Sequence, residues 1–191
     1  KHDADGLQPR PQYWLRFVVN DLASATGSFK LPPPGEYHLN SLRYAVFSCA
    51  NWRFGHFNGY ADAAQRRLDF WVHLGDFYYE YGADFYPLQH QAVREGLVPA
   101  HDAVTLADYR LRHGHYRRDA SLQNLTASAP LIAIWDDHEV ANDQWSYGAQ
   151  NHNDSKQDKY ITRKLAAAQA YREWMPVRGL DGDHPFSLHR S

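Results

Sequence analysis

Residues that could bind a metal ion or transfer a proton gather at three points of the chain, each directly after an apolar stretch. The densest group is the run Asp136-Asp137-His138-Glu139. The second is Asp76, which follows the turn-forming Gly75, and the third is Cys49. Four consecutive polar groups would be expensive to bury without partners, so the run at 136–139 indicates a polar site rather than part of a core.

A crevice lined by these residues would hold a thiolate, carboxylates and an imidazole, which are all metal ligands. The thiolate of Cys49 is a soft ligand that suits iron or zinc, whereas a position built of carboxylates suits calcium or magnesium. Two ions ~3.5–4 Å apart and bridged by Asp76 would clamp a phosphoryl group and generate hydroxide for in-line attack. The simpler alternative for Asp76 is that it only caps the turn after a strand, because Gly-Asp is common there.

Three short apolar runs rich in β-favouring residues predict the strands that position this site. They lie at residues 42–48, 69–74 and 130–135, and a short helix is expected between the first two, at 60–68. Strand, helix and strand of these lengths predict a βαβ unit, with a parallel pair and a right-handed crossover. Ligands of open α/β sheets bind outside the carboxyl ends of the strands, which is where the three polar groups fall.

Helices are predicted in the second half of the chain. Thr105-x-x-Asp108 has the pattern of a capping box and begins a helix that reaches about Arg117, and a second helix is expected at about 120–127. Ser155 is expected to cap a helix that runs to about Trp174, before Pro176. The first helix has a basic face, which we expect to be solvated, formed by Arg110, Arg112, Arg117 and Arg118. The last helix has an apolar stripe formed by Ile161, Leu165, Ala168 and Met175.

The amino-terminal residues predict a separate β unit. Leu7-x-Pro9-x-x-x-Tyr13 resembles the tyrosine corner of fibronectin-III-like sandwiches, and residues 13–19 alternate as a strand does. Too few residues precede the next domain to close a two-sheet core, so residues 1–35 are interpreted as the end of such a domain with a linker over 27–35, and residues 36–191 as a second domain. A simple hairpin packed on the main domain is the alternative.

Composition excludes several classes of protein. The formal net charge of −2 argues against stable binding of nucleic acid, and no apolar run is long enough to span a membrane. The single cysteine excludes a disulfide within the chain, and the first residues lack the pattern of a signal peptide. The 12 histidines are scattered, so only those beside other ligand types, such as His138, count as functional candidates.

In combination, three strings resemble one known family. FSCANW at 47–52, LDFWVHLGDFYYEYG at 68–82 and APLIAIWDDHEVANDQW at 129–145 are similar to the alkaline phosphatase D, or PhoD-like, branch of the calcineurin-like metallophosphoesterases. That superfamily carries Asp-x-His, Gly-Asp and Gly-Asn-His-Asp/Glu at successive strand ends. Here Cys49-x-Asn51, Gly75-Asp76 and the run at 136–139 stand in those places.

The resemblance implies a fold, an activity and a set of ligands. The expected fold is α/β: part of a calcineurin-like metallophosphoesterase domain with βαβ units and an open sheet. The expected activity is hydrolysis of phosphate monoesters or diesters by attack of a metal-bound hydroxide, in an exported protein, extracellular or periplasmic. Cys49 and Tyr79 would bind Fe³⁺, Asp76 would bridge the two metals, Asp137 would hold the Ca²⁺ side and His138 would assist the leaving group, with other divalent ions left open.

Two other interpretations compete with this one. Further ligands of the family come from strands after the third, and neither His184 nor His189 has a strand-end context, so the chain is interpreted as an amino-terminal portion that needs a downstream carboxyl-terminal segment. A non-catalytic fragment or interaction module with an incomplete metal site is therefore the first alternative. The second is an enzyme with Cys49 as nucleophile, which is disfavoured because Ala50 and Asn51 do not form a phosphate-cradling loop.

Overall fold

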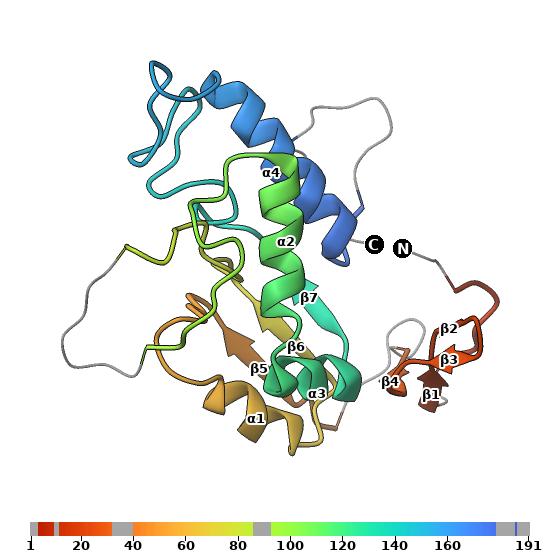
Figure 1. Ribbon diagram of the computed structural model, residues 1–191. Helices are drawn as coiled ribbons and strands as arrows, with labels where there is room; N and C mark the ends of the chain where they lie inside the picture. The colour runs from red at the N-terminus through yellow and green to blue at the C-terminus, as the bar shows by residue number, and fades with distance from the viewer. Residues whose placement is uncertain (1–3, 10–11, 32–39, 86–92, 179–185, 187–191) are drawn as a thin grey trace.

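The computed structural model describes residues 4–9, 12–31, 40–85, 93–178 and 186 (Figure 1). At its centre is a three-stranded parallel sheet in the order β5 (Tyr44–Phe47), β6 (Phe70–His73) and β7 (Leu131–Ala133). Each strand is a little shorter than the apolar run that predicted it. The mixed α/β class and the parallel pairing are those expected from the sequence.

Four helices connect or follow these strands. α1 (Asn58–Ala64) joins β5 to β6, and α2 (Leu106–Tyr116) and α3 (Ala120–Ser128) lie between β6 and β7. α4 (Tyr160–Trp174) follows β7. α1 packs against α3 near the sheet, and α2 packs against α4 (Figure 1). Among the described residues, no helix is long and apolar enough to cross a membrane.

The capping box at the start of α2 is present as predicted. The Thr105 side chain accepts a hydrogen bond from the Asp108 backbone N–H, and Asp108 in turn accepts one from the Thr105 backbone N–H. α1 begins and ends earlier than predicted. α4 begins at Tyr160 after Lys159, with no side-chain cap, so the prediction that Ser155 caps this helix is wrong.

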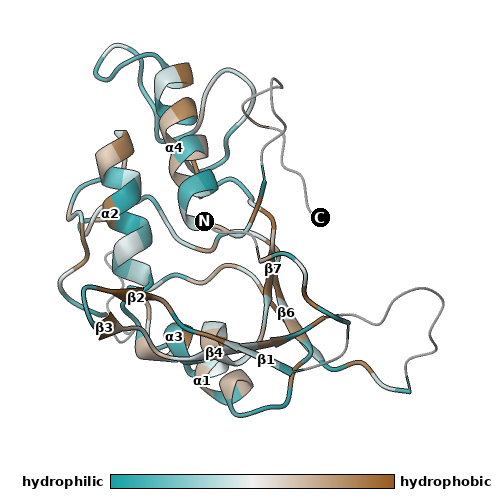
Figure 2. Ribbon diagram, turned by 90° about the vertical axis from the view of Figure 1, so that its right-hand side faces the viewer, coloured by the Kyte–Doolittle hydropathy of each residue, from teal (hydrophilic) through white to brown (hydrophobic). Residues whose placement is uncertain are grey.

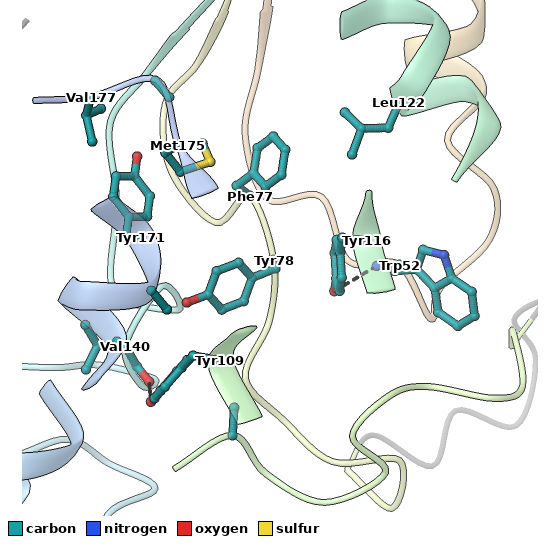
Figure 3. Packing of buried hydrophobic residues seen from close by; sticks show 14 of the residues in the cluster. Trp52, Phe77, Tyr78, Tyr109, Tyr116, Leu122, Val140, Tyr171, Met175 and Val177 are labelled. Atoms are coloured by element: carbon teal, nitrogen blue, oxygen red, sulfur yellow. Dashed lines mark hydrogen bonds between the residues drawn. The ribbon is translucent and has the colours of Figure 1, made fainter. Parts of the chain in front are cut away.

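The core between the sheet and the helices is built largely from aromatic rings. Tyr78, Tyr109 and Tyr116 are buried together with Trp52 (Figure 3). Their hydroxyl groups are satisfied by backbone: Tyr109 donates to the Val140 carbonyl at 2.6 Å, and Tyr116 accepts from the Trp52 N–H at 3.1 Å. Tyrosine combines a large apolar area with one polar atom, so this core can hold loops in place as well as pack.

The two faces of the sheet differ in burial. Phe47 packs its ring on Tyr60 of α1 at 4.8 Å between centroids, and Trp71 donates from its indole N–H to the Ala129 carbonyl after α3. On the opposite face Tyr44 and Val46 are 55% and 50% exposed. Figure 2 shows β6 and β7 with apolar residues along them. One face of the sheet is therefore covered by α1 and α3, and the other is largely open among the described residues.

The amino-terminal unit consists of two short antiparallel pairs. β1 (Gln12–Leu15) pairs with β4 (Gly27–Lys30), and β2 (Val18–Val19) pairs with β3 (Leu22–Ala23). The Tyr13 hydroxyl donates to the Gln8 carbonyl at 3.0 Å and accepts from the Gln8 N–H at 2.8 Å. This is the return contact that the tyrosine-corner pattern predicts, while the assignment to a fibronectin-III-like domain stays a prediction.

Two predicted helix faces are right only in part: Arg110 and Arg118 are exposed as predicted, and Ala168 and Met175 of the apolar stripe are buried. Arg112 is fully buried rather than solvated, because its guanidinium donates to backbone carbonyls, and Arg117 is also largely covered. Ile161 and Leu165 are 48% and 40% exposed, whereas the buried residues of α4 are Tyr160, Arg163, Ala167, Ala168, Ala170 and Tyr171. The linker predicted at 27–35 is wrong at its start, because residues 27–30 form β4 and pair with β1. Residues 32–35 of this linker, and His184 and His189, lie outside the described residues.

Candidate metal centre

The carboxyl ends of the three parallel strands meet, as predicted, at one edge of the sheet. Backbone hydrogen bonds continue across β5 and β6 beyond the strands, from the Cys49 N–H to the Gly75 carbonyl at 3.2 Å and from the Ala50 N–H to the Asp76 carbonyl at 3.0 Å. The Ile134 N–H extends the pairing of β7 with β6 by donating to the His73 carbonyl at 3.1 Å. These bonds fix the three loops next to one another.

All five predicted site residues come together at this edge. Ligand atoms of Asp76, Asp137 and His138 lie within 4.8 Å of one another, a grouping that could hold a metal ion. On the other side of Asp76, the Tyr79 hydroxyl donates to its Oδ2 at 3.3 Å, and the Cys49 thiol lies near enough to Asp76 and Tyr79 for both side chains to shift its pKa. Asp76 is therefore the residue shared by the two halves of the site.

The electrostatics of the cluster fit a cation. Burial raises the pKa of Asp76, and the nearby Asp137 carboxylate raises it further while His138 opposes the shift. Burial is also the main cause that raises the pKa of Cys49 and of Tyr79, and for Tyr79 the charges of Asp76 and Cys49 add to it. A bound cation would stabilise all three anions at once. The donor set of thiolate, phenolate and carboxylate thus suits a hard or borderline metal ion.

The backbone at the site is in an uncommon conformation. Cys49 and Asp76 have φ angles of 54° and 53°, in the left-handed region that non-glycine residues rarely adopt. Gly75 has a φ of 110°, and a Cβ added there would lie 2.5 Å from the Cβ of Asp136. Such strained conformations concentrate at functional sites, where the surrounding structure holds them. Here Gly75 allows the loops after β6 and β7 to approach each other.

Glu139 joins these two loops. Its carboxylate accepts from the backbone N–H groups of Asp76 at 3.0 Å, Phe77 at 2.6 Å and Asp136 at 2.8 Å. The side chain is fully buried, which raises its pKa to about 7 against the opposing effect of these hydrogen bonds. The fourth residue of the predicted polar run is therefore a clamp between the loops rather than part of the metal-binding cluster.

His138 is held by a second buried carboxylate. Its Nδ1 lies 2.7 Å from Oε2 of Glu80, and the two side chains are 8% and 0% exposed. Burial lowers the pKa of His138, but the hydrogen bond and charge of Glu80, with smaller contributions from Asp76 and Asp137, outweigh burial and leave the pKa raised. An imidazole in this setting can carry a proton close to Asp76 and Asp137, the other two residues of the candidate metal site.

Three residues that support the site were not identified from the sequence. Glu80 holds His138, Arg112 donates to the carbonyls of Tyr79 and Tyr81, and the Tyr116 hydroxyl accepts from the Tyr79 N–H at 3.2 Å. A lone glutamate inside the aromatic run FYYEYG was the one available signal, because a charge there requires a partner. Arg112 and Tyr116 look like ordinary helix residues.

The structure disfavours a nucleophilic Cys49. An activated thiol needs a lowered pKa, usually from a nearby histidine or basic group, whereas burial raises the pKa of Cys49 and the charge of the nearby Asp76 raises it further. The arrangement instead matches a metal ligand that becomes anionic when a cation is present.

Comparisons with known proteins point to one family. The model of the family described as PhoD-like phosphatase matches residues 44–191. Alkaline phosphatase D of Bacillus subtilis (strain 168) is 37% identical over 180 residues, which cover 92% of this chain and 30% of the relative. A solved structure described as that of PhoD superposes with a TM-score of 0.84 at 34% identity, covering 97% of this chain and 35% of that chain. The chain thus spans about a third of the length of these relatives.

Proposed function

Because the chain belongs to the PhoD-like phosphatase family, we propose that it contributes to an enzyme that hydrolyses phosphate monoesters or diesters at a two-metal centre. The observation that carries this proposal is the cluster at the three strand ends, where Asp76 lies between Cys49 and Tyr79 on one side and Asp137 and His138 on the other. Its residue types and its place outside the carboxyl ends of parallel strands both support a catalytic centre.

Each residue has a distinct proposed role. Cys49 and Tyr79 would hold Fe³⁺, Asp137 would hold Ca²⁺ or another divalent ion, and Asp76 would contact both. When bound, the ions would supply Lewis-acid activation of water and neutralise charge on the phosphoryl group. His138 would donate a proton to the leaving oxygen or stabilise its developing charge. Glu139 and the Gly75 turn would keep the loops in register.

We further propose that a segment beyond Ser191 completes the domain. The open face of the sheet exposes Tyr44 and Val46 of β5, and Ile132 and Ile134 lie on the same side at 38% and 40% exposure. A buried parallel sheet is normally covered on both faces, so this apolar surface supports a further covering layer. The chain spans only 30% and 35% of the length of its two relatives, which supports the same proposal. If so, the isolated chain would be weakly active or inactive. We also propose, by resemblance to the family, that the protein is exported from the cytoplasm.

The proposal is tested with Asp76→Asn in the full-length protein. We expect phosphate ester hydrolysis to be abolished and bound iron and calcium to fall, because the amide lacks the charge shared by both metal positions. Metal analysis, hydrolysis of aryl phosphates and thermal unfolding are measured together. Asp62→Asn is the control, since Asp62 is exposed on α1 and only pairs with Arg66.

Two results would contradict the proposal. Retention of two tightly bound ions in Asp76→Asn would exclude the shared role of this carboxylate. A folded full-length wild-type protein that binds no metal and hydrolyses no phosphate ester would favour the alternative, a non-catalytic interaction module with an incomplete site. A ferric ion held by Cys49 and Tyr79 should also colour the wild-type protein, so an active but colourless enzyme would exclude the iron assignment.

A further inference from the structure

Glu80 is, like Glu139, a fully buried carboxylate with three hydrogen-bond partners near the site, and the proposed chemistry assigns it no role. Oε2 faces Nδ1 of His138 at 2.7 Å, while Oε1 accepts from the Asn142 backbone N–H at 2.7 Å and from the Asn151 side-chain amide at 2.8 Å. A buried charge is retained at such cost only where its partners require it.

The same short segment also supplies two aromatic contacts to the imidazole ring. Tyr79 and Tyr81, which flank Glu80 in sequence, lie against His138 with ring centroids at 4.1 and 5.2 Å. Arg112 in turn fixes this segment by donating to the carbonyls of both tyrosines. The ring of His138 is therefore held by the hydrogen bond to Glu80 and by contacts with two aromatic side chains, Tyr79 tilted by 36° and Tyr81 by 63° to the imidazole plane.

We propose that Glu80 is the positioning residue of His138, and that it fixes both the orientation of the ring and which nitrogen serves the reaction. A carboxylate can only accept hydrogen bonds, so Glu80 requires a proton on Nδ1. Nε2 is then the nitrogen left to exchange a proton with the leaving oxygen. This inference rests on the role proposed above for His138 and adds to it the residue that makes that role work.

Glu80 also links His138 to the loop after it. The Asn142 N–H and the Asn151 amide mark two points of the loop that follows the metal-binding residues, and both meet Oε1. Three donors thus converge on one carboxylate, and an amide cannot replace it. If the carbonyl of a glutamine at position 80 faced Asn142 and Asn151, its NH₂ group would face Nδ1 of His138, which would then have to accept.

The test is Glu80→Gln in the full-length protein. We expect the proton of His138 to move from Nδ1 to Nε2 in the neutral ring, which ¹⁵N-histidine NMR of the metal-free protein detects, with the signals assigned by their loss in His138→Ala. We expect kcat for phenyl phosphate to fall by ~10²-fold or more while kcat for 2,4-dinitrophenyl phosphate changes little, because a good leaving group needs no proton. Metal content should stay unchanged.

Asn151→Ala is the matched control. It removes one donor to Oε1 and leaves the contact between Glu80 and His138, so the tautomer should stay as in the wild type and both substrates should respond equally. A selective loss in Asn151→Ala as large as that in Glu80→Gln would attribute the effect to the loop and overturn the proposal.

Further outcomes separate this inference from the proposed function. An unchanged tautomer, or an equal loss of kcat for the two substrates in Glu80→Gln, would overturn the role of Glu80 while the enzyme itself remains active. Absence of phosphoesterase activity in the wild type would overturn the proposed function, and the NMR result would still report whether Glu80 sets the tautomer of His138. In the background of His138→Ala, Glu80→Gln should no longer alter the leaving-group dependence.

Discussion

At the scale of single residues, the site depends on buried charges that each have a defined partner. Glu139 is fully buried and accepts three backbone N–H groups, and Glu80 is fully buried and accepts from His138, Asn142 and Asn151. These carboxylates exchange their hydration for donors from two or more loops. Each therefore acts as a junction, and a change at one of them should disturb more than one loop.

A different kind of buried polar residue is His113 of α2. Both of its ring nitrogens are buried and have no hydrogen-bond partner among the described residues, and its ring is parallel to that of Trp174, with centroids 5.8 Å apart. Burial, with a smaller effect of Arg117, lowers the pKa of His113 well below its usual value. The folded protein therefore holds this ring neutral at a pH where the unfolded chain would bind a proton.

His113→Phe should make the protein more resistant to acid. Because the pKa is lower in the folded state, the contribution of His113 to stability is fully present above pH ~6.5 and is lost as pH falls below that value. We expect the free energy of unfolding of the variant to exceed that of the wild type by a margin that grows by about 1.4 kcal/mol per pH unit between pH 6 and 5. Denaturant unfolding of the full-length protein at both pH values measures it, and a constant difference would contradict the assignment.

At the scale of elements, strand ends were predictable from sequence, and helix faces only in part. The apolar runs that end at Cys49, Asp76 and Asp137 have the length and composition of buried parallel strands, so their common edge followed from topology. The prediction for α4 included the buried Ala168 but missed Ala167 and Ala170, small residues that produce no hydrophobic stripe, and Arg163, a charged residue that such a stripe excludes.

Hydrogen-bond partners that lie far apart in the chain could not be predicted from the sequence either. Arg112 is satisfied by backbone carbonyls of Tyr81 and of residues near Pro99, and Glu80 by donors more than fifty positions away. Neither set of partners leaves a recognisable pattern in the sequence. Every residue has a backbone carbonyl, and every residue except proline has a backbone N–H, so residue type does not reveal these partners. The meeting of Cys49, Asp76 and Asp137 could thus be predicted from strand ends, whereas the buried residues that hold their loops required the structure.

Gly75→Ala tests the approach of the loops after β6 and β7. The added Cβ would have to displace the Cβ of Asp136 and the Asp136 N, at 2.5 and 2.6 Å, so the two loops must separate. Gly55→Ala is a matched control, since Gly55 has a φ of 99° but no atom within 4 Å of the added Cβ. We expect the control to cost ~1–3 kcal/mol from backbone strain alone, and Gly75→Ala to cost ~1–3 kcal/mol more.

Activity and metal content distinguish the two glycine variants further. Gly75→Ala should lose bound metal, because Asp76 and Asp137 would no longer lie close together, whereas Gly55→Ala should keep it. Equal thermal destabilisation and equal metal content in the two variants would show that the close approach of these loops is not needed by the site.

At the scale of the whole molecule, the two faces of the central sheet lead to the last prediction. Phe47 and Trp71 are covered by α1 and α3, but Tyr44, Val46 and Ile132 on the other face remain exposed by 55%, 50% and 38%. Burying apolar area of this kind contributes about 25 cal/mol per Å², so a layer that covered this face would stabilise the fold as well as bring further ligands to the strand ends.

We therefore expect the 191-residue chain to unfold at a lower temperature by itself than together with the segment proposed to follow Ser191. The separate segment, added in trans, should raise the melting temperature and restore iron binding and aryl phosphate hydrolysis. Val46→Glu in the full-length protein should mimic its loss, because a carboxylate on this face could be buried only at high cost. Leu111→Glu is the control, because Leu111 on α2 is exposed, and it should have little effect on stability or activity. If Val46→Glu leaves stability and activity unchanged, this face stays open to solvent, and the missing ligands must reach the strand ends without a layer that covers the sheet.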